Sequence, residues 1–304
     1  MRLGASPAVW LVVAAAAALA EDGPQAGRTI EEIVVTAQKT EQSIQDVPIS
    51  VTAISGEFIR AAGLTDLVDI VEYAPNVQFY ESSSLFASFN IRGFATPPLG
   101  LGLEPSVGLV IDDVPYGRST YAQDAVFDIE RLEVLRGPQG ALFGKNTVAG
   151  VMSFTTAEPA FEPAGYAALG LGSLRERRAE GGLSFPLVGD VLATRFSFRA
   201  HAENLDVFNT TREEENDVDD LAGRWKLLWL PSEDLELRLT AWASHQGAHG
   251  TTAQLARATP RSLEVFREFD PETEADSFDG RAQIDEKTSS GRTVYTVAPK
   301  AVWT

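Results

Sequence analysis

The stretch Val191-Leu192-Ala193-Thr194-Arg195-Phe196-Ser197-Phe198-Arg199-Ala200-His201-Ala202-Glu203-Asn204 alternates between two kinds of side chain. One face is mostly apolar from Leu192 onward, and the opposite face carries Arg195, Arg199 and Glu203. A period of two predicts a β-strand with one polar face. Such a strand fits a membrane barrel that is apolar outside and wet inside, and it also fits a soluble sheet with the reverse arrangement.

The connections between strands separate these alternatives. Further strands are expected at Tyr166–Leu171, Arg178–Phe185, Leu221–Pro231, Leu235–Ser244 and Arg292–Thr304. The connections Pro186–Asp190 and Pro231–Asp234 are tight turns, whereas Leu205–Asp220 and Gly247–Gly291 are long and polar. Short turns at one end and long loops at the other are typical of outer-membrane barrels, whose short side is periplasmic. We therefore predict that residues 163–304 form about six antiparallel strands of a transmembrane β-barrel.

The N-terminus carries the features of an export signal. Arg2 precedes an apolar run from Pro7 to Ala20, and Ala18-Leu19-Ala20 fits a cleavage site. The run is shorter than the roughly 20 residues that a membrane-spanning helix needs. We therefore expect residues 1–20 to be a cleaved signal peptide, followed by a periplasmic tail over residues 21–44.

Residues 45–157 predict a compact α+β domain. Helical turns are expected over residues 56–62, ended by Gly63, and over residues 64–71. Strands are expected at Pro48–Ile54, Val77–Tyr80, Ser88–Arg92, Val107–Ile111, Arg131–Leu135 and Gly150–Thr155. A Pro/Gly-rich loop over residues 96–105 is too irregular to be buried.

The composition excludes several classes of protein. Hydrophobic residues make up 44% of the chain, with no long apolar run after Ala20, which excludes a helical membrane protein. Cysteine is absent, so no disulfide framework or thiolate metal site is available. A net charge of -18 argues against a nucleic-acid partner. No nucleophile, base and orienting group occur together, so we do not expect an enzyme.

Several short motifs follow one another in the first half of the chain. They are Glu32-Ile33-Val34-Val35-Thr36-Ala37, Asp46-Val47-Pro48-Ile49-Ser50-Val51, Phe89-Asn90-Ile91-Arg92-Gly93-Phe94, Val110-Ile111-Asp112-Asp113-Val114-Pro115-Tyr116, Ile129-Glu130-Arg131-Leu132-Glu133-Val134-Leu135-Arg136-Gly137-Pro138 and Gln139-Gly140-Ala141-Leu142-Phe143-Gly144-Lys145-Asn146-Thr147. The first resembles a TonB box, and the others are similar to plug-domain signatures. In this order and spacing they resemble the TonB-dependent outer-membrane receptors.

The resemblance implies a plug domain over residues 45–157, lodged inside a 22-stranded barrel in the outer membrane of a Gram-negative bacterium. It implies active uptake of small-molecule cargo, a ferric siderophore or another scarce nutrient, without a cofactor. Energy would come from the TonB protein, which would bind Glu32, Ile33, Val34, Val35, Thr36 and Ala37 from the periplasm by strand addition. Twenty-two strands need about 220 residues, and 142 residues (304 − 162) follow Glu162, so we expect a truncated form.

Two sets of plug residues are candidates for the site. Charged residues at strand ends are hypothesised to hold the plug against the barrel wall by breakable ion pairs: Arg92, Glu130, Arg131, Glu133 and Arg136. The alternative, that they only solubilise the plug surface, has equal weight. Candidates for cargo contact, each of which also fits a core role, are Tyr80, Phe86, Phe94, Pro97, Leu99, Tyr116 and Tyr121. His245 and His249 have no third ligand nearby, so no metal site is expected.

A competing function comes from a different class of protein. The plug-like domain could fold alone as a non-transporting periplasmic binding or interaction module, with the later strands forming a soluble sheet. Recovery in the outer membrane or in the soluble periplasm separates the two.

Overall fold

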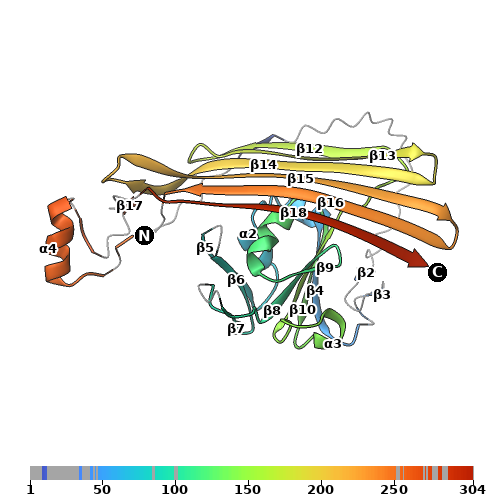
Figure 1. Ribbon diagram of the computed structural model, residues 1–304, viewed down its shortest axis with the longest axis horizontal. Helices are drawn as coiled ribbons and strands as arrows, with labels where there is room; N and C mark the ends of the chain where they lie inside the picture. Colours follow the sequence, from blue (N-terminus) through green and yellow to red (C-terminus); the bar gives the residue numbers. More distant parts are fainter. Residues whose placement is uncertain are drawn as a thin grey trace, which may run out of the picture.

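The computed structural model describes residues 9–11, 34–35, 42–43, 45, 47–83, 86–98, 102–250, 254–255, 257–269, 271, 273–275, 280–282 and 287–303. An α+β domain, here called the plug, lies against one face of a long antiparallel sheet (Figure 1). The long strands of residues 163–304 are called the barrel sheet.

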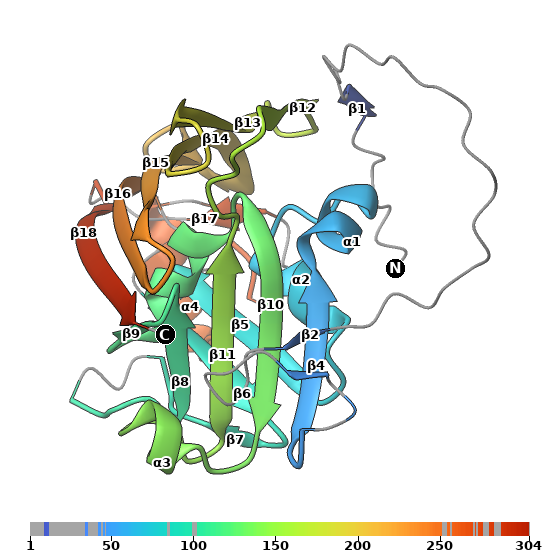
Figure 2. The same cartoon turned by 90° about the vertical axis from the view of Figure 1, so that its right-hand side faces the viewer.

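The plug contains two β-sheets. The main sheet has the order β4 (Ser50–Ser55), β10 (Ile129–Arg136), β11 (Gly150–Thr156), β8 (Val107–Ile111) and β9 (Val114–Tyr116) (Figure 2). The smaller sheet contains β5 (Val77–Ser83), β6 (Phe86–Ile91) and β7 (Phe94–Ala95). The predicted strands of this region are confirmed, with ends that differ by a few residues, and β7 and β9 are additional. The pair β8–β11 is parallel, and the other pairs are antiparallel.

Short helices connect and cover these sheets. Helix α1 (Gly56–Ala61) begins where the Ser55 hydroxyl accepts a hydrogen bond from the amide of Phe58 at 3.1 Å, and Gly63 follows it at φ +66°. Helix α2 (Leu67–Glu72) starts later than predicted and buries Ile70 and Val71. The 3-10 helix η1 (Ser119–Ala125) and the four-residue helix α3 (Gly140–Phe143) complete the plug. Its core is closed by Leu132, Val134 and Met152, which have no exposed surface.

Six long strands form the barrel sheet in chain order: β12 (Ala164–Leu171), β13 (Arg177–Val188), β14 (Leu192–Asn209), β15 (Glu214–Ser232), β16 (Leu235–His249) and β18 (Ser289–Trp303). All neighbours in this series are antiparallel. The number and order of the predicted strands are therefore confirmed. They form an open curved sheet that covers one side of the plug.

The prediction of a long polar loop over Leu205–Asp220 is wrong. Strand β14 continues to Asn209 and β15 begins at Glu214, which leaves only residues 210–213 between them. The acidic run stays in the sheet because its carboxylates find partners across the strands. Asp220, for example, lies 3.2 Å from Arg199 on β14. Dense charge therefore indicated polarity here and not the absence of a strand.

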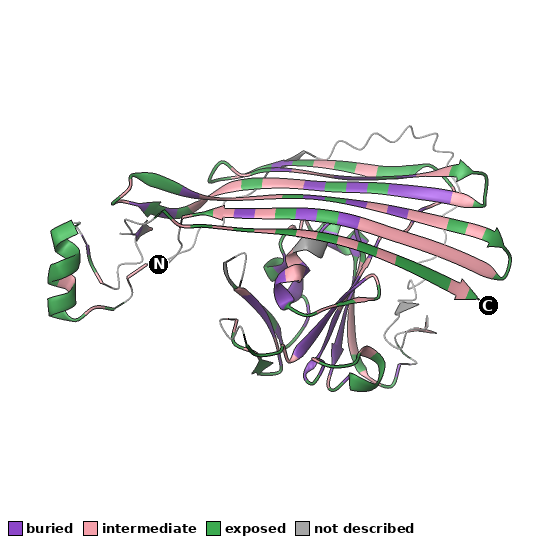
Figure 3. Cartoon of the chain, in the orientation of Figure 1, coloured by how far each residue is buried: buried purple, intermediate pink, exposed green. Residues whose placement is uncertain are grey.

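The two faces of the barrel sheet differ in burial, and buried and exposed positions alternate along its strands (Figure 3). Arg195, Ser197 and Arg199 on β14 are 6–8% exposed and face the plug, whereas Phe196 and Phe198 are 51% and 48% exposed on the far side. The apolar face is thus outside and the charged face inside, as in a barrel that meets lipid on one side and a polar interior on the other. This burial pattern selects between the two arrangements that alternation alone left open.

The connection between β16 and β18 is long, as predicted. Its described parts include helix α4 (Pro260–Phe269) and β17 (Arg281–Ala282), which pairs in parallel with the end of β14. Within the described residues, no helix has the length and apolarity needed to cross a membrane.

The N-terminal segments contribute short strands. Val9–Leu11, inside the predicted signal peptide, form β1 and pair with β12, and β2 (Val34–Val35) pairs with β3 (Gln42–Ser43). Of the predicted TonB box, only Val34 and Val35 lie within the described residues.

Candidate functional site

Four inward-facing cations of the barrel sheet contact the plug, three of them at one short segment, residues 126–128. They are Arg195 and Arg199 on β14 and Arg224 and Lys226 on β15, each at most 8% exposed. Arg199 Nη1 donates to the carbonyl of Val126 at 2.8 Å, and Arg224 Nη1 donates to the carbonyl of Phe127 at 3.1 Å. Alternation makes this possible, because every second residue of a strand points to the same face.

Asp128, the next residue of that plug segment, is held most firmly. Its carboxylate accepts from Arg195 Nε at 2.7 Å and also from Arg195 Nη2. Its amide donates to Glu180 Oε1 on β13 at 3.2 Å, and the Tyr166 hydroxyl donates to the same oxygen at 2.5 Å. Gly182 leaves room for the pair of Arg195 and Asp128, because a Cβ at this position would lie only 2.5 Å from Arg195 Nη2.

Lys226 makes a second contact between the wall and the plug. Its ammonium lies 3.3 Å from the carboxylate of Asp112 and donates to the Thr156 carbonyl and to Glu158, both at 2.9 Å. Asp112 also accepts from the Thr156 amide at 2.8 Å and hydroxyl at 2.7 Å. Burial alone would raise the pKa of Asp112, but Lys226, Arg224 and these hydrogen bonds hold that pKa below its ordinary value. Asp112 therefore stays charged inside the interface.

A neutral contact lies further along the wall. The Tyr116 hydroxyl accepts from Trp242 Nε1 on β16 at 3.1 Å and lies 3.1 Å from Thr296 Oγ1 on β18. Burial raises the pKa of Tyr116, so its hydroxyl remains protonated. Tyr116, predicted as a cargo contact, thus packs against the barrel sheet.

The charged residues predicted to clamp the plug make hydrogen bonds and ion pairs within the plug, and Glu130 also interacts electrostatically with Lys226 and Arg195 of the wall. Arg136 donates to Thr52 Oγ1 and to the Pro75 carbonyl, both at 2.8 Å, and Arg92 Nη2 donates to Ser50 Oγ at 3.4 Å. Arg131 lies 2.7 Å from Glu133 and 3.8 Å from Glu130. Their role at the barrel wall stays a prediction.

Residues missed by sequence reasoning make the strongest contacts between plug and wall. Asp66, Asp112, Asp128 and Glu158 all belong to loops or turns, where a carboxylate normally indicates only solubility. The available signal was the row of cations on one face of β14 and β15, which requires acceptors opposite it.

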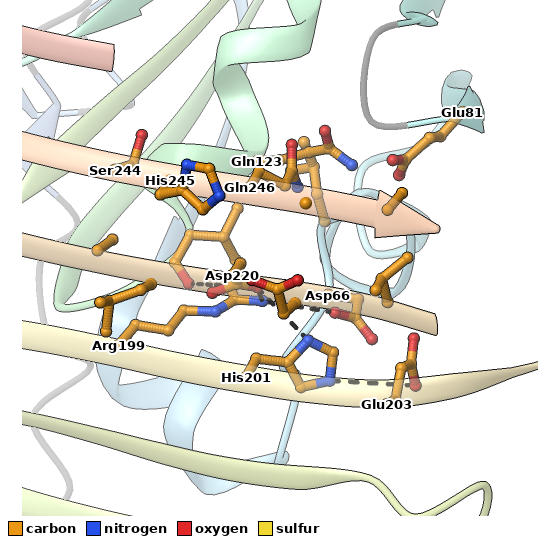
Figure 4. Close-up of a pocket in the computed structure, with 18 of the residues that line it drawn as sticks. Asp66, Glu81, Gln123, Arg199, His201, Glu203, Asp220, Ser244, His245 and Gln246 are labelled. Atoms are coloured by element: carbon orange, nitrogen blue, oxygen red, sulfur yellow. Dashed lines mark hydrogen bonds and ion pairs between the residues drawn. The ribbon is translucent and has the colours of Figure 1, made fainter. Parts of the chain in front are cut away.

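A cavity of about 680 Å³ lies between the plug and the barrel sheet (Figure 4). Tyr80, predicted as a cargo contact, is 60% exposed and lines it. The other cargo candidates are not gathered there. Phe94 is exposed on β7, and Phe86 is half-buried at the start of β6. Pro97 lines a separate small hollow, and the ring of Tyr121 packs against the guanidinium of Arg292. Leu99 lies outside the described residues.

The two histidines considered as metal ligands have separate partners. His245 Nδ1 lies 2.9 Å from Thr293 Oγ1, and His249 Nδ1 lies 2.8 Å from Asp217 Oδ1. The ligand atoms of Asp217, Asp219 and His249 lie within 4.8 Å of one another. An acidic group of this kind is common on strand ends without an ion.

Comparison with protein families and curated proteins gives three relevant matches. Residues 43–151 match the TonB-dependent Receptor Plug Domain. The chain is 30% identical over 193 residues to the pesticin receptor of Yersinia pestis, covering 63% of this chain and 28% of that receptor. It is 29% identical over 160 residues to the vitamin B12 transporter BtuB of Vibrio vulnificus (strain CMCP6), covering 50% of this chain and 25% of that protein.

Solved structures share the fold. The ferric yersiniabactin uptake receptor FyuA of Yersinia pestis superposes with a TM-score of 0.69 at 22% identity, over 84% of this chain and 38% of that one. The ferripyoverdine receptor of the Pseudomonas aeruginosa outer membrane gives a TM-score of 0.62 at 16% identity, over 75% and 30%. The chain spans less than a third of the length of the curated relatives named here. Residues 43–151 thus belong to the TonB-dependent receptor plug-domain family, and the chain as a whole is similar in sequence and fold to outer-membrane receptors.

Proposed function

We propose that this chain is part of a transporter that takes a scarce nutrient, a ferric siderophore or a similar complex, across the outer membrane, with the plug as its gate. The family consists of receptors and not of enzymes. The relatives' names point to iron complexes and to vitamin B12, and transport by this chain is inferred from that kinship.

The polar interface between plug and wall carries the proposal. Arg195, Arg199, Arg224 and Lys226 meet plug carboxylates and carbonyls, and the contact is built mainly from hydrogen bonds and ion pairs. Water can replace such bonds one by one, whereas a dry apolar interface resists separation. A gate that must move inside a wide barrel needs a contact of this kind.

We further propose that the TonB protein pulls on residues 32–37 from the periplasm. Val34 and Val35 already adopt β-structure, in a pair with β3. Strand addition to a partner would use the same backbone groups. Force transmitted through the tail would then reach β4, the edge strand of the main plug sheet.

Fractionation of cells that express the chain tests the location. Recovery in the outer membrane supports the transporter, and a soluble periplasmic pool supports the binding module instead. Uptake is tested with ⁵⁵Fe bound to a panel of siderophores and with labelled vitamin B12, in cells that lack their own receptors.

The coupling step is tested by deletion of residues 32–37. In the full-length version of the receptor, we expect this deletion to abolish uptake while cargo binding stays intact. Deletion of residues 21–26, of equal length and in the same tail, is the matched control and should leave uptake intact. Equal uptake by the two deletions would refute the coupling role.

A further inference from the structure

The cavity between plug and wall lies at the end of the barrel sheet opposite the tight turns that join β13 to β14 and β15 to β16. Its wall side includes Leu205, Val218 and Gly250, next to the connections after β14 and β16. Its plug side comes from α2, from the end of β5 and from Gln123 of η1 (Figure 4). In the transporter proposed above, this end faces the exterior.

The charge of the cavity lining is strongly negative. One arginine lines it, Arg199, and this residue already lies 3.2 Å from Asp220 and 4.0 Å from Asp66. The carboxylates of the lining are Asp66, Asp69, Glu81, Glu203, Asp219 and Asp220. Within the described residues, neither Asp69 nor Glu81 takes part in an ion pair. Burial is the main reason that the pKa of each of these two carboxyls is raised, and a cation that enters would favour their charged forms.

The lining also contains buried polar atoms that lack a partner. Ser244 is 5% exposed, and in the described part of the chain its Oγ has no hydrogen-bond partner. The same holds for Gln123 Oε1, which faces the cavity from the plug. An amide oxygen can only accept, so a ligand that satisfies it must carry an N–H or O–H donor, whereas Arg199 Nε, which also lacks a partner among the described residues, needs an acceptor. Unsatisfied buried atoms of this kind are costly unless a ligand or water completes them.

The arrangement of the lining favours an extended occupant over a bare metal ion held by the plug. Among the described residues, the group of ligand atoms close enough to share an ion is Asp217, Asp219 and His249, and it contains no plug residue. The plug carboxylates of the lining share it with the apolar residues Leu67, Phe79, Val126 and Phe127. An extended organic cation can contact dispersed carboxylates and an apolar wall together.

We propose that this cavity binds an organic cation, an ammonium or amidinium-type group on an apolar frame, and that the cargo is positively charged at the end that enters it. The cargo assignment rests on the proposed transport function. The charge preference of the cavity rests on the lining alone.

Benzamidine, benzamide and benzoate test the charge preference, because they share one ring and differ in charge. Their binding to the purified full chain in detergent is measured by saturation-transfer NMR titration. We expect benzamidine to bind at least about tenfold more tightly than benzamide, since a charge-assisted hydrogen bond is stronger than a neutral one. Benzoate should be the weakest. Equal binding of all three, tighter binding of benzoate, or no binding of benzamidine overturns the proposal.

Charge-neutral variants locate the effect. Asp69→Asn/Glu81→Gln should lower the affinity for benzamidine about tenfold, towards that of benzamide. Glu81→Gln alone, in a partly exposed position, should give part of the loss. The control Glu57→Gln/Asp190→Asn removes two exposed carboxylates away from the cavity and should change nothing. An unchanged preference in the cavity variants contradicts the proposal.

The outcomes distinguish this inference from the transport function. A chain that fractionates with the outer membrane and takes up cargo, yet prefers benzoate, refutes the cation site and leaves transport standing. A soluble periplasmic chain that prefers benzamidine refutes transport and leaves the charge preference of the cavity standing.

Discussion

Arg195 on β14 and Asp128 in the plug form a two-point ion pair, in which Nε and Nη2 of one guanidinium each donate to a different carboxylate oxygen. Asp128 is 1% exposed at its side chain, and Arg195 is 10% exposed. The pair joins the plug to the wall across 67 positions of sequence. This pair is the first target for mutation, because removing one partner leaves the charge of the other buried and unpaired.

Asp128→Asn should weaken the attachment of the plug by about 3–5 kcal/mol. Asn keeps the shape and tolerates the left-handed φ of +53° at this position, so the change removes charge and not backbone fit. Urea denaturation of the purified chain, followed by tryptophan fluorescence, measures the loss. Asp113→Asn breaks the exposed pair with Lys300 and should cost less than about 1 kcal/mol. Equal midpoints for the two variants would contradict the assignment.

Lys226→Met should make the protein more sensitive to acid. In the wild type the pKa of Asp112 lies below its ordinary value of 3.8, so its contribution to stability is present above about pH 4. It is lost as the pH falls through that value towards the folded-state pKa. Without Lys226 the effect of burial gains weight, the pKa of Asp112 rises, and the loss begins at higher pH.

Urea midpoints measured between about pH 7 and pH 3 check this shift. Lys300→Met removes an ammonium from an exposed ion pair and serves as the control. Its acid transition should occur at the same pH as in the wild type. An acid transition at the same pH in Lys226→Met and wild type would rule out the proposed coupling between Lys226 and Asp112.

Gly56→Ala should destabilise the plug by about 1–3 kcal/mol through overpacking. A Cβ at Gly56 would lie 1.8 Å from the carbonyl oxygen of Ile129, so α1 would have to move away from β10. Gly140→Ala is the matched control, because a Cβ there meets nothing within 4 Å. Thermal unfolding by circular dichroism should show a lower midpoint for the first variant alone.

Phe196→Arg should reduce recovery of the chain in the outer membrane. The side chain lies on the apolar outer face as the fifth residue of β14, and a cation near the bilayer midplane costs about 2–4 kcal/mol. Phe208→Arg lies near the loop end of the same strand, where the cost falls to about 0–1 kcal/mol. Quantitative fractionation compares the two, and a similar loss for both would argue against burial of this face in lipid.

Sequence patterns predicted the strands well, because alternation and turn residues are local. They located all six strands of the barrel sheet and the cap at Gly63. The contacts between plug and wall could not be predicted in the same way. Asp112 lies in a turn of the plug, and its partner Lys226 lies more than a hundred positions later. The loop predicted over Leu205–Asp220 was wrong, because the density of acidic residues was given more weight than the alternation of side chains.

The hairpin of β14 and β15 is longer than a bilayer requires. Its 18 and 19 residues extend for about 60 Å at roughly 3.3 Å per residue, whereas the apolar band of such barrels is about 25 Å tall. Even a strongly tilted hairpin would therefore rise well above the lipid. In the proposed orientation, the acidic tip of this hairpin would project into the solvent outside the cell. It would be among the first parts of the molecule that a dissolved solute meets.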